Sequence, residues 1–311
     1  MSTYRISQFL YSIVRSVIGG KGFSKYKIIR KGKKFAENNI QSSSHSDNML
    51  YNFHEYPFCT YVQGHEMYLD PSDSLCLSTN SVFEPYTTEV IKQNISNGDL
   101  VIDIGANIGY FTLIMAKGIK ENGKVFSFEP EPKNFELLKK NVEINNYSNV
   151  ILEKKAIGNK TGITKLYLAN RKNNVFSSGM HRIFRSDLVS QIPDPISINI
   201  IKLDDYLQDL KFIKKIRLIK IDVEGAEFDV LKGMNKILDE NKEIKIVMEF
   251  SSENLEDYGS NPSDVMDFLI NKGFKLSIIN EVEKRMEEVT GIKGIIDSEA
   301  KKIGLNIFCS R

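Results

Sequence analysis

From Leu100 onward, short apolar runs alternate with segments of helical periodicity, and this alternation constrains the fold more than any other feature. The apolar runs are LVIDI (100–104), KVFSF (124–128), NVILE (149–153), IRLIKID (216–222), EIKIVMEF (243–250), FKLSIIN (274–280) and IGLNIFCS (303–310). Between them, apolar residues recur at helical spacing in 108–118, 133–145, 226–234 and 263–272. Buried strands separated by helices predict a doubly wound α/β domain with a parallel sheet covered on both faces.

The residues before this domain predict two further regions. Residues 1–50 hold an amphipathic helix over 4–18, a basic tract and a linker rich in Ser and Asn over 36–50. Residues 51–99 hold a hairpin around Gly64 and further elements that lead into the α/β domain of residues 100–311.

Charge is distributed unevenly along the chain. Residues 1–35 contain nine of the 42 basic residues and no Asp or Glu, so the rest has 33 basic residues against 40 acidic ones (42 − 9 = 33). An acidic body argues against a nucleic-acid partner. The basic helix favours either peripheral contact with a membrane or packing on its own domain or a second subunit in a homo-oligomer.

Membrane-spanning and disulfide-bonded classes are disfavoured by the sequence. No apolar stretch reaches the roughly 18 residues of a spanning helix, and no signal-peptide pattern is present. The three cysteines, Cys59, Cys76 and Cys309, are far apart and form no metal-binding pair. We therefore expect a reduced, cytoplasmic protein.

Three motifs follow the first three strands of the α/β domain. Asp103-Ile-Gly-Ala-Asn-Ile-Gly-Tyr-Phe111 joins the first strand to the first helix, Glu129 ends the second strand, and Lys155-Ala-Ile-Gly158 follows the third. The first motif lacks the second glycine of G-x-G-x-x-G and the lysine of a phosphate-binding loop. At this edge of the sheet, a ligand without phosphates is expected, with the Glu129 carboxylate accepting from ribose hydroxyls.

These segments resemble those of the FkbM methyltransferase family. The resemblance rests on DIGANIGYF, SFEPEP, KKAIGNKTG, IKLDDYL, IKIDVEGAEFDVLKG and LNIFCS, in that order, and covers roughly residues 58–311. It implies a class I methyltransferase fold, Rossmann-like, with a seven-stranded sheet whose last strand is antiparallel. It also implies that residues 100–311 form a methyltransferase domain whose cofactor is S-adenosylmethionine.

Cofactor-binding positions also follow from the resemblance. Asp103, Gly105, Asn107 and Gly109 would hold the methionine part, Glu129 the ribose, and Ala156 and Ile157 the adenine. The remaining implied cofactor contacts are Glu84, Ala106, Phe111, Pro130, Ser178 and Asp222.

The acceptor side is expected at Asp222-Val-Glu-Gly-Ala-Glu227, after the fourth strand. Asp222 and Glu224 are the candidate catalytic residues that position or deprotonate a hydroxyl oxygen, which is a weak nucleophile while protonated. Lys220 shares the strand face of Asp222 and is expected to pair with it. Glu227 is either part of the site or a first-turn helix charge.

Three further residues complete the candidate set. Glu249 ends the fifth strand and is a pocket candidate. His181 is a further catalytic candidate, because it lies with Ser177 and Ser178 in a long polar loop, 171–193, that could cover the acceptor. No metal is predicted, although the carboxylates near Asp222 are also of a kind that could hold a divalent cation.

The expected activity is O-methylation of a carbohydrate, glycan or secondary metabolite. An NAD-dependent oxidoreductase shares the strand–loop–helix pattern, but the missing glycine and the IDVEGAE segment disfavour it. Methylation of a nucleic-acid base nitrogen is disfavoured because DVEG replaces the Asn/Asp-Pro-Pro-aromatic tetrapeptide of those enzymes. A non-catalytic scaffold recruited by its N-terminus is the third alternative.

Overall fold

The alternating strands and helices that the sequence predicts are present in the computed structural model, which describes residues 58–71, 73–167, 195–208, 215–289 and 305–311. The strands are β1 (Cys59–Val62), β2 (His65–Tyr68), β3 (Leu100–Ile104), β4 (Lys124–Phe128), β5 (Val150–Glu153), β6 (Ala156–Ile157), β7 (Gly162–Leu166), β8 (Ile196–Ile201), β9 (Ile216–Ile221), β10 (Lys245–Phe250), β11 (Lys275–Asn280), β12 (Arg285–Glu288) and β13 (Leu305–Ser310). The helices are α3 (Leu77–Asn80), α4 (Pro85–Gln93), α5 (Tyr110–Ile119), α6 (Pro132–Ile144), α7 (Leu203–Tyr206), α8 (Glu227–Gly233), α9 (Asn235–Glu240), α10 (Ser252–Tyr258) and α11 (Pro262–Asn271).

The main sheet has eight strands in the order β12-β11-β13-β10-β9-β3-β4-β5. Strands β10, β9, β3, β4 and β5 are parallel, and β13 runs antiparallel to both β10 and β11. Without β12, this is the class I methyltransferase sheet, with seven strands and an antiparallel last strand. Strand β12 is an addition that the sequence pattern does not predict, because its residues RMEE are largely exposed and show no apolar pattern.

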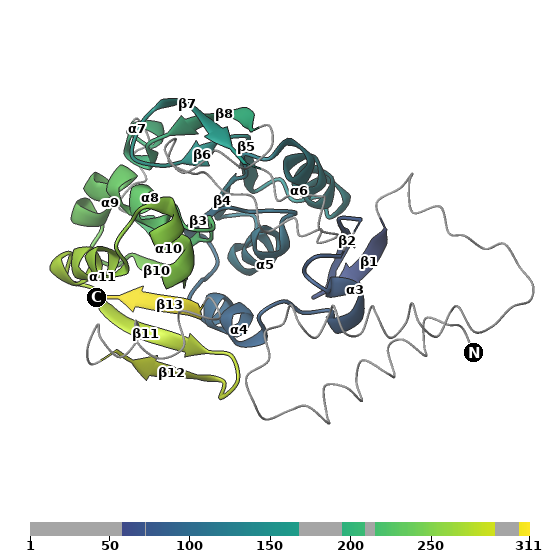
Figure 1. Cartoon of the computed structure of the whole chain (residues 1–311). Helices are drawn as coiled ribbons and strands as arrows, with labels where there is room; N and C mark the ends of the chain where they lie inside the picture. The colour runs from purple at the N-terminus through teal and green to yellow at the C-terminus, as the bar shows by residue number, and fades with distance from the viewer. Residues whose placement is uncertain (1–57, 72, 168–194, 209–214, 290–304) are drawn as a thin grey trace, which may run out of the picture. The chain divides into compact units, whose positions relative to one another are not determined.

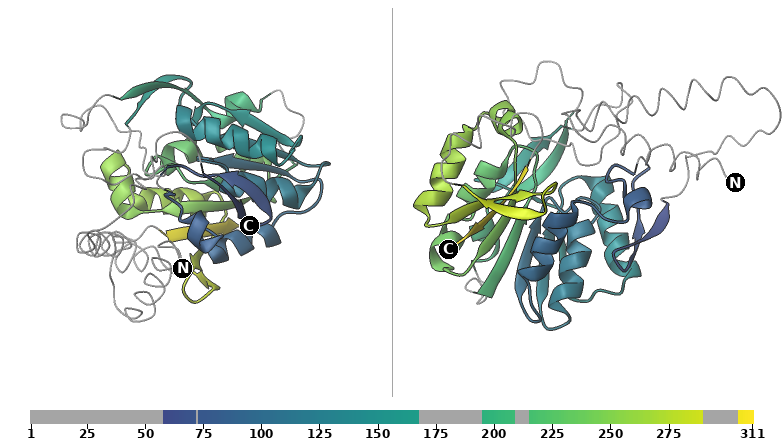
Figure 2. Two further views of the ribbon diagram at one scale, coloured as in Figure 1. Left: turned by 90° about the vertical axis from the view of Figure 1, so that its right-hand side faces the viewer. Right: turned by 90° about the horizontal axis from the view of Figure 1, so that it is seen from below.

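Helices cover both faces of the main sheet. Figures 1 and 2 show α4, α5 and α6 on one face and α8, α9, α10 and α11 on the other. In β3, Ile102 and Ile104 pack with the second group of helices, whereas Val101 packs with the first. This alternation follows from the two-residue period of a strand, which turns successive side chains to opposite faces.

Two helices on opposite faces begin at signals that are visible in the sequence. Glu131 caps α6 by accepting from Asn134 N at 2.6 Å, and Asn261 caps α11 by accepting from Ser263 N at 2.9 Å. Each cap precedes a proline at the first helical position, where the missing N–H is not needed. These caps fix where the chain enters α6 after β4 and where it enters α11 after α10.

Two smaller sheets accompany the main one. The hairpin predicted around Gly64 is confirmed as β1 and β2, which pair antiparallel. The three-stranded sheet β6-β8-β7 is not predicted, because β6 has two residues and β7 is mostly exposed. The helix expected over 4–18, the linker over 36–50 and the loop over 171–193 lie outside the described residues. None of the helices described is long and apolar enough to span a bilayer.

Candidate functional site

Polar side chains form a row across the face of the main sheet that carries α4 and α5. Asp103 of β3 stands beside Lys220 of β9, and Glu249 of β10 stands beside Asn306 of β13. Each of them alternates with apolar neighbours that enter the opposite core, such as Ile221 beside Lys220. The strand period therefore collects polar groups from four strands at one place on this face.

The glycine-rich loop, which joins β3 to α5, lies against the turn that joins β9 to α8. A Cβ on Gly105, where φ is +82°, would lie only 1.8 Å from the backbone oxygen of Asp222. Asp222 N also donates to Ile104 O at 3.0 Å. Glycine is required at 105 because the backbone is left-handed and no space exists for a side chain. The predicted cofactor loop and the predicted acceptor turn are therefore in direct contact.

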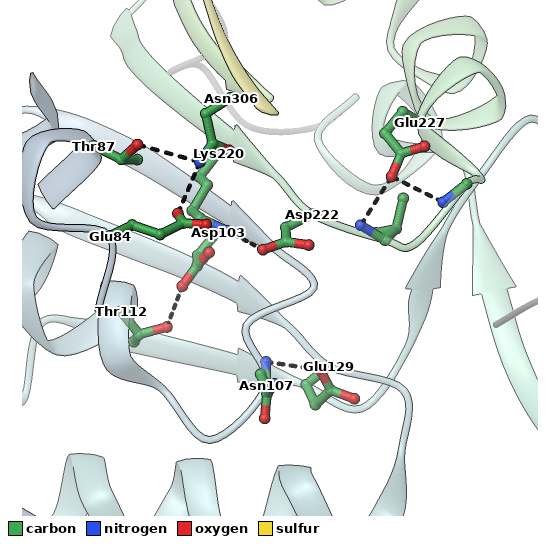
Figure 3. A network of polar contacts seen from close by, with 12 residues as sticks. Glu84, Thr87, Asp103, Asn107, Thr112, Glu129, Lys220, Asp222, Glu227 and Asn306 are labelled. Carbon is green, nitrogen blue, oxygen red and sulfur yellow. Dashed lines mark hydrogen bonds and ion pairs between the residues drawn. The ribbon is translucent and has the colours of Figure 1, made fainter. Parts of the chain in front are cut away.

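Glu129 joins the glycine-rich loop to the end of β4, as Figure 3 shows. Its Oε2 accepts from Asn107 N at 2.8 Å, and its Oε1 accepts from Glu131 N at 2.8 Å. Burial raises the pKa of Glu129 to about 8, with a further increase from the carboxyls of Glu131 and Asp103. Each carboxylate oxygen keeps a second lone pair, so the group can still accept from a ligand hydroxyl.

Lys220 is the cation at the centre of the row. Its ammonium donates to Asp222 Oδ2 at 2.8 Å and lies 4.5 Å from the centre of the Phe111 ring. Burial alone would lower the pKa of Lys220, but the carboxyls of Asp222, Asp103 and Glu84 outweigh it and raise the pKa. The predicted pairing of Lys220 with Asp222 is thus present, and the lysine stays charged.

Asp103 lies beneath the glycine-rich loop and is 1% exposed. Its Oδ2 accepts from Thr112 Oγ1 at 2.6 Å, whereas its Oδ1 is buried and has no hydrogen-bond partner within the described residues. Burial raises the pKa of Asp103. An unsatisfied carboxyl oxygen at this depth is costly unless a donor reaches it. Within the described residues, the hydrogen bonding of the row is therefore incomplete.

Glu84 reaches the row from the start of α4. Asn306 Nδ2 donates to Glu84 Oε2 at 2.8 Å and to Thr87 Oγ1 at 3.2 Å. Burial raises the pKa of Glu84 to about 7, and Lys220 opposes the shift. Glu84 has φ of 43°, an unfavourable conformation that its burial and these contacts hold in place.

Three carboxylates gather where β9 and β10 end. Asp222, Glu224 and Glu249 each offer an oxygen, and these oxygens lie within 4.8 Å of one another. Glu249 Oε2 is buried with no hydrogen-bond partner among the described atoms. Burial, together with the nearby carboxyls of Asp222 and Glu224, raises the pKa of Glu249 well above its ordinary value. These three carboxyls suit proton transfer, and their oxygens also lie close enough together to share a cation.

The other predicted cofactor positions lie in the glycine-rich loop, after β4 and in β6. Gly109 is the N-cap of α5, with φ of +96°, and a Cβ there would lie 2.7 Å from Leu138 Cδ1. Ala106 N donates to Phe128 O at 3.0 Å. Pro130, which follows Glu129, is partly exposed, and Ala156 and Ile157 of β6 are buried. Ser177, Ser178 and His181 lie outside the described residues.

Three polar residues of the site are missed by the sequence analysis. Asn306 contacts Glu84, Thr112 contacts Asp103, and Asn254 Nδ2 donates to Glu224 Oε2 at 3.1 Å. Thr112 had a signal, because it lies in the first turn of a helix that begins at the glycine-rich loop. Asn254 and Asn306 are distant in sequence from their partners, so no local pattern marks them.

The residues present fit S-adenosylmethionine. This cofactor carries a sulfonium and an ammonium group, and the row offers the unsatisfied Oδ1 of Asp103 together with several carboxyls. Gly105 leaves the loop backbone open to close approach, and Glu129 can accept from the ribose hydroxyls.

Comparison with protein families gives two matches. The model described as the methyltransferase FkbM domain matches residues 103–276, which is more than half of the chain. The model for protein-L-isoaspartate(D-aspartate) O-methyltransferase matches residues 37–161. Both matched segments include the glycine-rich loop and Glu129, and the first alone continues through the Asp222 turn.

Individual relatives are methyltransferases from fungi, a bacterium and an archaeon. The chain is 29% identical over 147 residues to Methyltransferase 1 of Beauveria bassiana, covering 43% of this chain and 58% of that one. It is 27% identical over 158 residues to 31-O-demethyl-FK506 methyltransferase FkbM of Streptomyces tacrolimicus, covering 44% and 60%. It is 25% identical over 149 residues to hexuronic acid methyltransferase AglP of Haloferax volcanii, covering 48% and 55%. The matches thus span little more than half the length of these relatives.

Among solved structures, methyltransferase FkbM from Methylobacillus flagellatus KT is similar with a TM-score of 0.41 and 16% identity. That similarity covers 69% of this chain and 44% of the other.

Proposed function

The chain belongs to the FkbM methyltransferase family, whose methyl donor is S-adenosylmethionine, and we propose that it methylates a hydroxyl oxygen of a carbohydrate, a glycan or a secondary metabolite. The observation that carries this proposal is the contact between Gly105 and Asp222. It brings the loop proposed to hold the cofactor against the turn that carries Asp222 and Glu224.

The proposed cofactor side consists of the row and the glycine-rich loop. When bound, S-adenosylmethionine supplies an electrophilic methyl group on a sulfonium. Glu129 would accept from the ribose hydroxyls, and the buried Oδ1 of Asp103 would accept from a donor of the methionine part. The carboxyls of Glu84 and Asp222 favour a positively charged ligand at this place.

On the acceptor side, a carboxylate must hold and deprotonate the hydroxyl. The acceptor oxygen has to approach the methyl carbon to about 3–3.5 Å, in line with the sulfur–methyl bond, which breaks to leave a neutral thioether. As the new oxygen–carbon bond forms, the hydroxyl proton would pass to a carboxylate oxygen of Asp222 or Glu224. Lys220 holds the Asp222 carboxylate in place from below, which limits the reorganisation needed during the step.

The class of acceptor rests on the relatives. One is named for 31-O-demethyl-FK506 and one for hexuronic acid. These names support a hydroxylated small molecule or sugar as the acceptor of this chain.

The direct test uses methyl-labelled S-adenosylmethionine with a panel of acceptors. The panel contains neutral sugars, uronic acids and hydroxylated macrolides, each paired with an analogue that lacks the hydroxyl. We expect label in the hydroxylated members alone, in a product that survives mild alkali, as a methyl ether does. Label released as methanol would assign carboxyl methylation, and absence of cofactor binding by calorimetry would refute the proposal. Each reaction is repeated with EDTA, and turnover is expected to persist because Lys220 already neutralises Asp222.

A further inference from the structure

The turn between β9 and α8 has a backbone conformation that needs support from outside. Glu224 has φ of 56° and Gly225 has φ of 113°. A residue with a side chain seldom occupies the left-handed region, and the cost persists only where the surroundings fix it. The turn that carries Asp222 and Glu224 is therefore held by contacts with its neighbours.

Glu227 supplies the first set of contacts. It is 2% exposed, and its Oε1 accepts from Gly225 N at 3.1 Å and from Val223 N at 3.3 Å. Figure 3 shows the carboxyl pointing back at these two backbone nitrogens, away from its own helix. The side chain thus satisfies two N–H groups on either side of Glu224, a role beyond that of a helix-end charge.

Helix α10 supplies the second set. Asn254 Nδ2 donates to Glu224 Oε2 at 3.1 Å, and a Cβ on Gly225 would lie 2.4 Å from Asn254 O. Gly225 therefore allows the first turn of α10 to rest directly on the turn. Asn254 is itself fixed, because its backbone N donates to the Ser251 side chain that caps α10.

We propose that Glu227 and Asn254 are positioning residues that clamp the Asp222–Gly225 turn from two sides and hold Glu224 beside Asp222 and Glu249. The catalytic meaning of the clamp rests on the proposed function, whereas the clamp itself does not. Without Glu227, two backbone N–H groups lose their acceptor and the turn can leave its left-handed conformation. The Glu224 carboxylate would then move away from the acceptor side, while Glu129 and the glycine-rich loop would stay as they are.

Amide hydrogen exchange of the full chain, without cofactor or acceptor, tests the clamp directly. In Glu227→Ala, protection of the Val223 and Gly225 amides is expected to fall at least ~10-fold, with protection in α5 and β3 unchanged. Glu227→Gln keeps an oxygen that can accept both bonds and should retain most of the protection. The matched control is Glu253→Gln, an exposed residue of α10, which should match the wild type.

Asn254→Leu tests the second side of the clamp without altering the Glu227 bonds. Asn254→Leu alone is expected to lower protection of the turn. If Glu227→Ala does not fold, Asn254→Leu and Glu227→Gln still test the clamp. Unchanged protection in Glu227→Ala and Asn254→Leu would overturn the proposal. So would a loss spread evenly over α8, which would assign Glu227 to the stability of that helix.

Turnover separates the clamp from the proposed function. With an acceptor found in the labelled-donor panel, Glu227→Ala should lower kcat by ~10²-fold, and Glu227→Gln should restore most of it. The affinity for S-adenosylmethionine should stay within about threefold of wild type in both. Methyl transfer absent from the wild-type protein, with the exchange pattern as expected, would refute the proposed function and leave the clamp standing. Wild-type kcat in Glu227→Ala would refute the positioning role of the clamp in catalysis and leave the proposed function standing.

Discussion

The ammonium nitrogen of Lys220 lies 2.8 Å from Oδ2 of Asp222, two residues further along the chain. The lysine side chain is 2% exposed, whereas that of Asp222 is 28% exposed. The ion pair therefore runs from the interior to the surface of the site. Its buried end is fixed above the Phe111 ring, and its exposed end is available to a ligand.

The first prediction concerns the charge of Lys220. Lys220→Met leaves the carboxyls of Asp103, Glu84 and Asp222 without this buried cation, and unfolding free energy should fall by about 3–5 kcal/mol at about pH 8. The loss should shrink toward about pH 5, because burial raises the pKa values of Asp103 and Glu84 and these two carboxyls then take up protons. Denaturant unfolding at both pH values measures it. The control Lys139→Met breaks an exposed pair with Glu143 and should cost less than about 1 kcal/mol. Equal losses in the two variants would contradict the prediction.

The second prediction assigns the proton acceptor. Asp222→Asn or Glu224→Gln should lower kcat by at least ~10²-fold, because each replaces a carboxylate by an amide that cannot take up the hydroxyl proton. Affinity for S-adenosylmethionine should change little in Glu224→Gln. Steady-state kinetics and calorimetry measure the two effects, with Glu256→Gln on the exposed side of α10 as the control. Full activity in both variants would transfer the role to Glu249 or His181.

The third prediction concerns the ribose end of the cofactor. Above about pH 8, where Glu129 is charged, Glu129→Gln should weaken S-adenosylmethionine binding at least ~10-fold, because charge-assisted hydrogen bonds of about 1.5–3 kcal/mol each are at stake. Calorimetry compares this variant with Glu136→Gln, an exposed residue of the neighbouring α6. Wild-type affinity in Glu129→Gln would remove Glu129 from the site.

The fourth prediction gives the pH dependence of that binding. The pKa of Glu129 is raised to about 8 by burial, so below that pH the free protein holds a protonated carboxyl. The ribose hydroxyls donate to the charged form, and Kd should therefore rise by up to about tenfold for each pH unit below 8 and level off above it. Calorimetry between about pH 6 and pH 9 measures the slope. The same slope in Glu129→Gln would show that another group is responsible.

The fifth prediction uses two glycines with similar backbone angles. Gly105 has φ of +82°, and an added Cβ would lie 1.8 Å from Asp222 O, whereas Gly98 has φ of +90° and nothing within 4 Å. Gly98→Ala should cost only the strain of a left-handed alanine, about 1 kcal/mol. Gly105→Ala should cost several times as much and abolish cofactor binding. Thermal unfolding and calorimetry compare the two, and equal costs would contradict the close approach.

The sequence contains enough local information for the strand and helix pattern and for part of the site. Strands such as LVIDI and IRLIKI have residues that alternate between two cores, and helices such as α6 have a cap and a proline at their start. The glycine-rich loop from Gly105, the carboxylate of Glu129 and the turn from Asp222 each follow a strand. Parallel strands end at one edge of a sheet, so their convergence is predictable from the chain alone.

Tertiary structure decided the contacts between segments that are far apart in the chain. Asn306 reaches Glu84 across 222 positions, and Asn254 reaches Glu224 across 30. These pairs depend on the strand order β13-β10-β9-β3 and on where α10 rests, neither of which a local pattern encodes. The same holds for β12 and for the sheet of β6, β7 and β8, whose short or exposed strands exist only because a neighbouring strand offers hydrogen bonds. Sequence periodicity fixes which side of a strand a residue occupies, whereas only the packed fold fixes which residue it meets there.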